Sequence, residues 1–125
     1  MRISARDKRM YALAWRTAKT SECDDQHGAV LTMGSRVLKT AVNSAAGGGR
    51  GLQVTQHAEL RLVRDTRNWR QNHEGGTVYS ARFHAFPISK PCEECQEALR
   101  ESGIVRVVYH DGWQLHELGF KGYIW

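Results

Sequence analysis

The chain has 125 residues, about the size of one ordinary domain, with 41% hydrophobic and 25% charged residues and no low-complexity block. This composition excludes a disordered or fibrous protein, and we expect a single domain over residues 1–125. No apolar stretch approaches the roughly 20 residues of a membrane-spanning helix, and the N-terminus lacks the apolar segment of a signal peptide. We therefore expect a cytoplasmic protein with no membrane partner. A net charge of +5 favours anionic partners such as nucleotides or nucleic acid.

Hydrophobic periodicity and turn residues predict alternating helices and strands. Ser4 and Asp7 form a capping-box pattern before the first helix. Gly34-Ser35 and Asp111-Gly112 each separate two strand-like segments, the pattern of hairpins with two-residue turns, and the second pair favours a type I′ turn. We expect helices over about residues 5–20, 55–72 and 91–102, and strands over 28–33, 36–42, 77–83, 104–109 and 113–116.

Two longer loops lie between these elements. The segment 43–51 contains four glycines and is expected to be a mobile loop, because glycine loses the most backbone freedom on ordering. The segment 84–90 separates the third predicted strand from the third predicted helix. The second hairpin makes the last strand antiparallel to its predecessor.

Three potential metal ligands stand where two predicted helices begin. Cys92 and Cys95 lie on one face of a first helical turn, where the positive helix end favours thiolates, the form that binds metal. His57 begins the other helix and would supply a third ligand. Two thiolates and one imidazole around Zn²⁺ leave one position for water, as in catalytic zinc sites. Cys23 has no partner at metal-ligand spacing, and three cysteines do not make a disulfide framework.

Glu59, two residues after His57, is the candidate proton carrier for such a site. It would take the proton of a water activated by the metal and pass it to a leaving amine. The order H-x-E followed by P-C-x-x-C is the signature of zinc-dependent nucleobase deaminases.

Through these motifs the chain resembles the cytidine/deoxycytidylate deaminase superfamily, and the likeness extends from the Gly28-Ala29-Val30 strand through Asn43 to the strand 104–109. The resemblance implies a three-layer α/β/α sandwich around a five-stranded mixed sheet. It also implies Zn²⁺ as the cofactor and a homo-oligomer. The reaction implied is hydrolytic conversion of cytosine to uracil on a free nucleoside or nucleotide, such as cytidine, deoxycytidine or dCMP, with release of ammonia.

The resemblance also assigns roles to individual residues. His57, Cys92 and Cys95 are the expected zinc ligands, and Glu59 is the expected proton shuttle. The resemblance also places Asn43 at the sugar of the substrate. Independently of the resemblance, Arg50 and Lys90 are candidate phosphate contacts, because cations suit anions. The other candidate substrate contacts are Ala58, Phe83, His84 and Pro91.

Some features of the chain depart from typical members of this superfamily, and they indicate different branches of it. The segment 84–90 intervenes where typical members reach the Pro-Cys motif after a few residues, and Ala45 stands where free-cytidine deaminases carry an acid. The predicted final hairpin resembles cytidine and blasticidin-type deaminases more than deoxycytidylate or tRNA adenosine deaminases. Two alternatives remain open: a deaminase acting on cytosine or adenine within single-stranded DNA or RNA, and a non-catalytic zinc-binding homologue.

Overall fold

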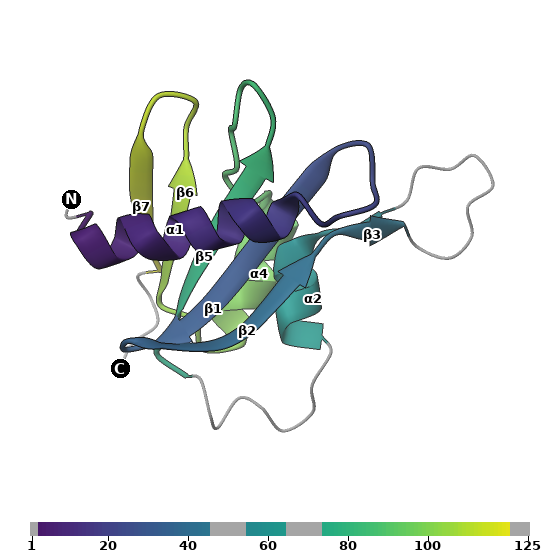
Figure 1. The fold of residues 1–125 in the computed structure, drawn as a ribbon. Coiled ribbons are helices and arrows are strands. Elements are labelled where there is room, and N and C mark those ends of the chain that lie inside the picture. The colour runs from purple at the N-terminus through teal and green to yellow at the C-terminus, as the bar shows by residue number, and fades with distance from the viewer. Residues whose placement is uncertain (1–2, 46–54, 65–73, 121–125) are drawn as a thin grey trace.

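The computed structural model describes residues 3–45, 55–64 and 74–120 (Figure 1). In chain order the elements are α1 (Ala5–Ala18), β1 (Gln26–Met33), β2 (Arg36–Val42), β3 (Ser44–Ala45), β4 (Thr55–Gln56), α2 (Ala58–Arg64), β5 (Thr77–Phe83), α4 (Glu93–Glu101), β6 (Arg106–His110) and β7 (Leu115–Gly119). The predicted helices and strands are present in the described ranges, with ends that shift by a few residues. The second helix begins at Ala58 and not at residue 55, because Thr55 and Gln56 pair as β4 with β3, which occupies residues 44–45 of the predicted mobile loop. Residues 46–51 of the predicted mobile loop and residues 65–72 of the second predicted helix lie outside the described residues.

The start of α1 follows the predicted capping box. The Ser4 hydroxyl accepts a hydrogen bond from the Asp7 backbone N–H at 3.0 Å, and the Asp7 carboxylate accepts one from the Ser4 N–H at 2.9 Å. These two bonds satisfy donors that the first helical turn would otherwise leave unpaired. The helix ends at Ala18, two residues before the predicted end, where Thr20 N–H turns back to the Thr17 carbonyl at 2.9 Å.

The main sheet has five strands in the order β2-β1-β5-β6-β7. The β5–β6 pair is parallel and the other neighbouring pairs are antiparallel, so the sheet is mixed and its last strand is antiparallel, as predicted. Outside this sheet, β3 and β4 form a separate antiparallel pair. The first predicted hairpin is confirmed, since Met33 pairs with Arg36 across a two-residue turn in which Gly34 has a φ of 60°.

The second hairpin differs from its prediction. His110 pairs with Leu115, so four residues, 111–114, form the loop in place of a two-residue type I′ turn. The Asp111 carboxylate accepts hydrogen bonds from the backbone N–H groups of Trp113 and Gln114, at 2.7 and 2.9 Å, and these bonds close a wider loop. β7 therefore begins at Leu115, and Trp113 is 89% exposed.

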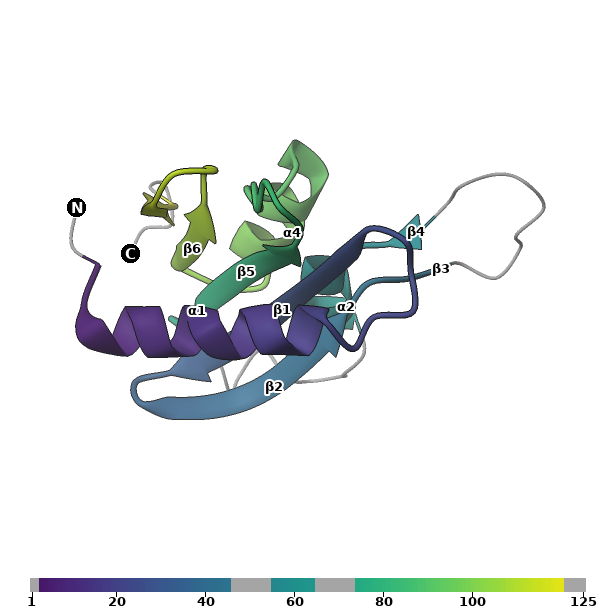
Figure 2. The ribbon, with the colours of Figure 1, turned by 45° about the horizontal axis from the view of Figure 1, so that its top comes forward.

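Helices cover both faces of the sheet (Figures 1 and 2). Side chains alternate between the two faces, so Val30 packs toward α1 while its neighbours Ala29 and Leu31 pack toward α2 and α4. The core on the α1 side contains Ala14, Val30, Tyr79, Ala81 and Val108, and the core on the other side contains Ala29, Leu31, Ala58, Leu62, Val78, Leu99, Ile104, Val107 and Phe120. The predicted three-layer α/β/α sandwich is confirmed.

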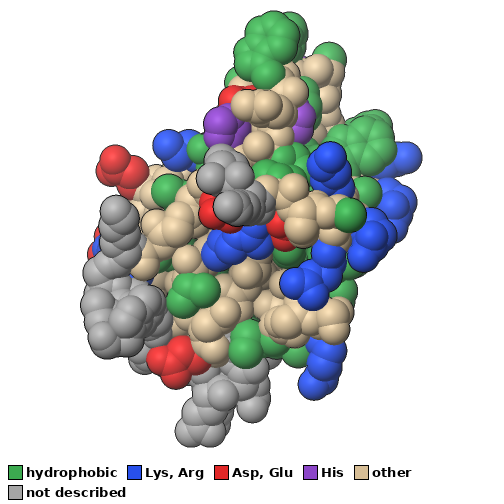
Figure 3. Space-filling model, turned by 90° about the vertical axis from the view of Figure 1, so that its left-hand side faces the viewer, with side chains coloured by type: hydrophobic (Ala, Val, Ile, Leu, Met, Phe, Trp, Pro, Cys, Tyr) green, Lys and Arg blue, Asp and Glu red, His purple; other side chains and the backbone are tan. Residues whose placement is uncertain are grey.

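The face shown in Figure 3 carries cations without one continuous basic stripe among its described residues. In Figure 3, Lys and Arg side chains gather along one edge of the face shown and are interspersed with apolar and polar surface. Among the described helices, none combines the length and the apolar character needed to cross a membrane.

Candidate active site

A cavity of about 560 Å³ lies where the starts of α2 and α4 meet the end of the sheet that carries His27 and Asn43. Four stretches of chain form its wall. The lining residues are Glu22, Cys23, Asp24, Asp25, His27, Asn43, His57, Glu59, Ser89, Lys90, Pro91 and Cys92. A volume of this size is in the range of small-molecule sites.

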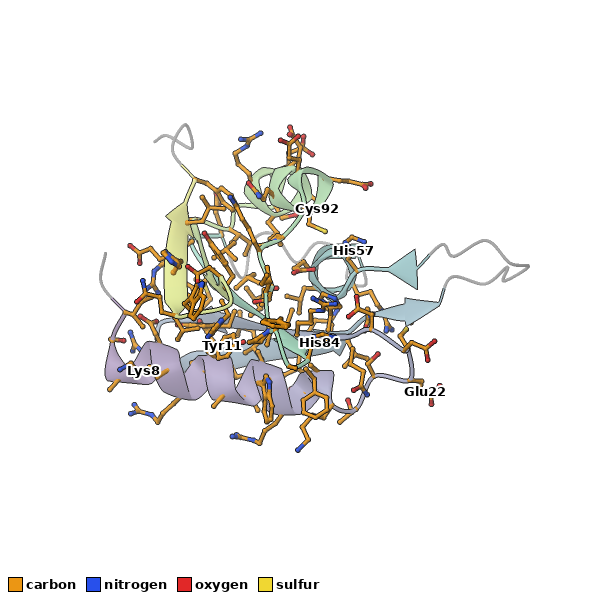
Figure 4. All side chains as sticks on the ribbon, turned by 90° about the horizontal axis from the view of Figure 1, so that it is seen from above. Lys8, Tyr11, Glu22, His57, His84 and Cys92 are labelled. Carbon is orange, nitrogen blue, oxygen red and sulfur yellow. The ribbon has the colours of Figure 1, made fainter. Side chains whose placement is uncertain are left out.

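The three predicted metal ligands meet at this cavity, as Figure 4 illustrates for His57 and Cys92. The His57 Nδ1 atom lies 3.2 Å from Cys95 Sγ and 3.7 Å from Cys92 Sγ. All three ligand atoms lie within 4.8 Å of one another. His57 immediately precedes α2, Cys92 is the N-cap of α4, and Cys95 lies in the first turn of α4, so the two helix starts bring the donor atoms together.

The chemistry of this donor set fits a metal cation. Burial raises the pKa of the Cys95 thiol well above its usual range, and the nearby Glu59 carboxylate and Cys92 raise it further. A thiolate at this position therefore requires a positive charge that these neighbours do not supply. A divalent cation between the sulfur atoms and the imidazole would supply it.

Glu59 lies in the first turn of α2 and is buried, with 4% of its surface exposed. The Ser80 hydroxyl on β5 lies 2.5 Å from Glu59 Oε2. The same hydroxyl lies 2.9 Å from the Ser89 backbone carbonyl. A carboxylate that faces the cavity beside three metal-ligand atoms is suited to moving protons there.

The inserted segment 84–90 does not displace the cysteines, because hydrogen bonds tie its end to the sheet. The Ser89 hydroxyl donates to the Ser80 carbonyl at 2.7 Å and accepts from the His110 N–H at 3.0 Å. The Ser89 N–H donates to the His110 carbonyl at 2.9 Å. The chain thus leaves β5, returns beside it at Ser89, and continues directly into the buried Pro91 and the N-cap Cys92.

Asn43 holds the opposite wall of the cavity in place. Its Oδ1 atom accepts hydrogen bonds from the Ser21 hydroxyl at 2.7 Å and from the His27 N–H at 3.0 Å. Its Nδ2 atom donates to the Asp25 carbonyl at 2.7 Å. An amide has two N–H groups. One of them is used in this bond, and within the described residues the other is available to a ligand.

Asp25 and His27 form a hydrogen-bonded edge of the cavity. Arg82 Nε donates to Asp25 Oδ1 at 2.8 Å, and His27 Nε2 lies 3.2 Å from Asp25 Oδ2. Burial acts to raise the pKa of Asp25, but the bonds from Arg82 and His27 outweigh it and hold the pKa below its usual value. Asp25 is therefore ionised, and it orients the His27 ring.

The structure brings only some of the candidate substrate contacts to the cavity. Asn43, Lys90 and Pro91 line it, and the Lys90 Nζ atom lies 6.0 Å from the centre of the Tyr109 ring. Phe83 packs edge-on against Trp15 on the α1 side, with 4.9 Å between ring centroids.

The remaining candidates are placed differently. His84 accepts a hydrogen bond from the Phe86 N–H within its own loop, at 3.0 Å. Neither it nor Phe83 is among the lining residues. Ala58 is fully buried in the core below α2. Arg50 lies outside the described residues.

Several residues at or next to the cavity belong to none of the sequence motifs. Glu22, Cys23, Asp24 and Ser89 line the cavity, and Ser80 contacts the lining residue Glu59 through its hydroxyl. One available signal was a polar residue at an inward position of a strand. Ser80 has the same parity as the buried Val78 on β5.

Three metal ligands beside a buried carboxylate, in a cavity of an α/β/α sandwich, form the arrangement of a metal-dependent hydrolase. The chain belongs to the cytidine and deoxycytidylate deaminase family, because the model of that family's zinc-binding region matches residues 4–111. The family's zinc-binding region and the group of His57, Cys92 and Cys95 together identify Zn²⁺ as the cofactor.

Solved structures with the same fold include the dCMP deaminase from the cyanophage S-TIM5. Its apo form is similar to this chain with a TM-score of 0.64 and 18% sequence identity, over 90% of each chain. The complex of that enzyme with dCMP and dUMP gives a TM-score of 0.60 and 17% identity, over 80% of this chain and 76% of the other. At this level of identity the similarity establishes the fold. No curated protein matches this chain.

Proposed function

We propose that this protein is a hydrolytic deaminase that converts cytosine to uracil on a free nucleoside or nucleotide, such as cytidine, deoxycytidine or dCMP. The observation that carries the proposal is the buried Glu59 carboxylate in the same cavity as the mutually close donor atoms of His57, Cys92 and Cys95. The dCMP and dUMP bound by the S-TIM5 enzyme support a cytosine nucleotide as one member of the substrate class.

His57, Cys92 and Cys95 would hold the zinc ion. When bound there, zinc supplies the Lewis acidity that makes water nucleophilic near neutral pH. Glu59 transfers one proton of the attacking water to the ring nitrogen and later the remaining hydroxyl proton to the leaving amine. One C–O bond forms at C4 of the ring and the C–N bond to the amino group breaks, so the water oxygen remains as the ring carbonyl and the amino group leaves as ammonia.

The remaining wall of the cavity suits the sugar and any phosphate of the substrate. The Asn43 N–H that no described residue uses is a donor for a sugar hydroxyl, and His27 lies beside it. Lys90 also lines the cavity and is a cation available to an anionic group. Asn43 and Lys90 are thus the proposed substrate contacts, with Arg50 as a second phosphate contact.

We also propose that residues 1–125 act as one domain in a cytoplasmic homo-oligomer. A metal-binding pair of free cysteines, Cys92 and Cys95, fits a reducing compartment. Phe86 and Trp113 are 68% and 89% exposed, and subunit contacts commonly cover aromatic side chains of this kind. Light scattering is expected to give a mass above that of one chain, and a one-chain mass across micromolar concentrations would contradict the oligomer.

The test of function is the product formed by zinc-loaded protein. Cytidine, deoxycytidine, their 5′-monophosphates, adenosine, guanine and a single-stranded oligonucleotide would be incubated in parallel and analysed by mass spectrometry. We expect conversion of a small cytosine compound, with a mass increase of about one unit per deamination and stoichiometric ammonia. Turnover of the oligonucleotide alone, or of none of these compounds, would contradict the proposal.

A further inference from the structure

Ser80 is the described residue that holds the Glu59 carboxyl group. It lies on the central strand β5, nine residues before Ser89 of the inserted segment 84–90, and it is 1% exposed. Its hydroxyl is 2.5 Å from Glu59 Oε2 and 2.9 Å from the Ser89 carbonyl oxygen. Within the described residues, this is the hydrogen-bond partner of Glu59, and it contacts one of the two carboxyl oxygens.

A serine hydroxyl has one hydrogen and two acceptor lone pairs, so Ser80 donates to only one of these two oxygens at a time. The contact with Oε2 is the shorter of the two, at 2.5 Å against 2.9 Å for the Ser89 carbonyl. Ser80 therefore fixes Oε2, and the other carboxyl oxygen, Oε1, makes no hydrogen bond with Ser80.

Ser89 keeps Ser80 in this position. The Ser89 hydroxyl donates to the Ser80 carbonyl at 2.7 Å, and both the N–H and the hydroxyl of Ser89 bond to the backbone of His110. Ser89 is 3% exposed, so water does not replace these bonds easily. The base of the segment 84–90 and strand β6 therefore support the hydroxyl that touches Glu59.

We propose that Ser80 is a positioning residue for Glu59: it holds Oε2 and leaves Oε1 as the oxygen that carries the proton between water and substrate. This inference rests on the proposed function. It assigns one task to each carboxyl oxygen and gives the end of the inserted segment a part in keeping the proton carrier in place.

The variant Ser80→Ala tests this inference, because it removes the hydroxyl and adds no bulk. A hydrogen bond to a charged group is worth enough that we expect kcat to fall by about 10- to 100-fold. KM is expected to stay within about threefold, since Ser80 is not a cavity-lining residue. Zinc content, measured by mass spectrometry of the metal, is expected to stay at one ion per chain. Ser80→Thr keeps the hydroxyl and is expected to restore most of kcat.

Thr32→Val is the matched control. Thr32 is a buried hydroxyl residue of the neighbouring strand β1, 3% exposed, and its hydroxyl contacts the Thr77 carbonyl rather than the cavity. We expect the kcat of this variant to remain within twofold of the wild type. An equal loss of kcat in Thr32→Val and Ser80→Ala would mean that Ser80 acts only through general packing.

Crystal structures of zinc-loaded wild type and Ser80→Ala supply a readout that does not depend on turnover. We expect Glu59 Oε2 on Ser80 in the wild type and a rotated or alternate Glu59 carboxyl in the variant. A Ser80→Ala enzyme with wild-type kcat and an unchanged Glu59 would overturn the inference, as would a loss of activity that follows loss of zinc. If the wild type deaminates none of the cytosine compounds, the proposed function fails, whereas the orientation of Glu59 in the two crystals still decides the role of Ser80.

Discussion

The two faces of the sheet differ in how their buried charged groups are paired. Under α1, the Asp7 carboxylate accepts hydrogen bonds from two nitrogens of Arg106, at 3.0 and 2.8 Å, and from the Tyr79 hydroxyl at 2.6 Å. The bonds from Arg106 hold the pKa of Asp7 far below its usual value. On the other face, the partner of Glu59 within the described residues is the neutral Ser80, and the pKa of the Cys95 thiol is raised by burial and by Glu59.

The difference separates a structural charge cluster from a functional one. Asp7 and Arg106 neutralise each other, and Arg106 also donates to Glu117 at 2.6 Å, so the cluster is complete without any ligand. The negative groups around Cys95 lack a described cation of this kind. Negative groups in a cavity that have no cationic partner are the groups to which a metal ion or a substrate can bind.

Among the changes that would distinguish the two faces, removal of zinc is expected to have the largest effect on activity and on the Tm. We expect a chelator that strips the metal to abolish activity and to lower the Tm by more than about 10 °C, because bound metal stabilises only the folded site. Hydrogen exchange should increase at the start of α4 and stay unchanged in α1, whose charges are already paired. A Tm insensitive to zinc would contradict the assignment of this donor set.

Asp7→Asn is expected to reduce the free energy of unfolding by about 3 kcal/mol, because it leaves the Arg106 guanidinium without its buried partner. Since the cluster lies on the face opposite the cavity, kcat should remain within about twofold. Denaturant titration measures the first effect and steady-state kinetics the second. Glu97→Gln is the control, because its ion pair with Arg100 is exposed and its loss should cost less than about 1 kcal/mol.

The same carboxylate predicts how stability depends on pH. The folded-state pKa of Asp7 lies below its ordinary value of 3.8, chiefly because of the hydrogen bond from Arg106. The unfolded chain therefore binds this proton first, so the stabilisation is complete above about pH 5 and is lost as the pH falls below the ordinary value. Unfolding free energies measured from pH 6 down to pH 3 should decrease less steeply for Asp7→Asn than for the wild type. Parallel curves would contradict the role given to Asp7.

Gly28→Ala is expected to have the smallest of these effects, about 2 kcal/mol of lost stability. A Cβ atom at Gly28 would lie 2.5 Å from the Ala18 nitrogen and 2.6 Å from the Ala14 carbonyl oxygen, so α1 would have to move away from β1. Gly119→Ala is the matched control on β7, because nothing lies within 4 Å of the added atom. Thermal unfolding of both variants measures the effect, and equal stability would contradict this close helix–strand contact.

Much of the fold was predictable because local signals agreed with it. The Ser4–Asp7 capping box and the Gly34-Ser35 turn each depend on residues close in sequence. The Asp111-Gly112 turn was predicted with the wrong length, because the Asp111 side chain caps two backbone N–H groups and stabilises a four-residue loop. The preference of the Asp-Gly pair for a two-residue turn does not include this capping by the aspartate side chain.

The residues of the candidate site also divide into those that could be predicted from the sequence and those that could not. His57, Glu59, Cys92 and Cys95 were found from spacing, because helix starts impose fixed separations on the residues that share them. Ser80 and Ser89 were not, because their pairing joins a strand to the end of an inserted segment and depends on tertiary structure. Segment 84–90, which lengthens the usual spacing, is a loop that leaves β5 and returns beside it, where Ser80 and Ser89 are hydrogen-bonded to each other.

The contrast between the two charge clusters is tested most directly by neutralising the Glu59 carboxylate. In zinc-loaded Glu59→Gln, the shape of the side chain is kept while its ability to carry protons is removed. We expect turnover of the cytosine substrate to fall by about 100- to 10 000-fold, with one zinc ion per chain retained. Wild-type turnover in this variant with its zinc in place would contradict the role of Glu59 as the proton carrier and, with it, the proposed reaction.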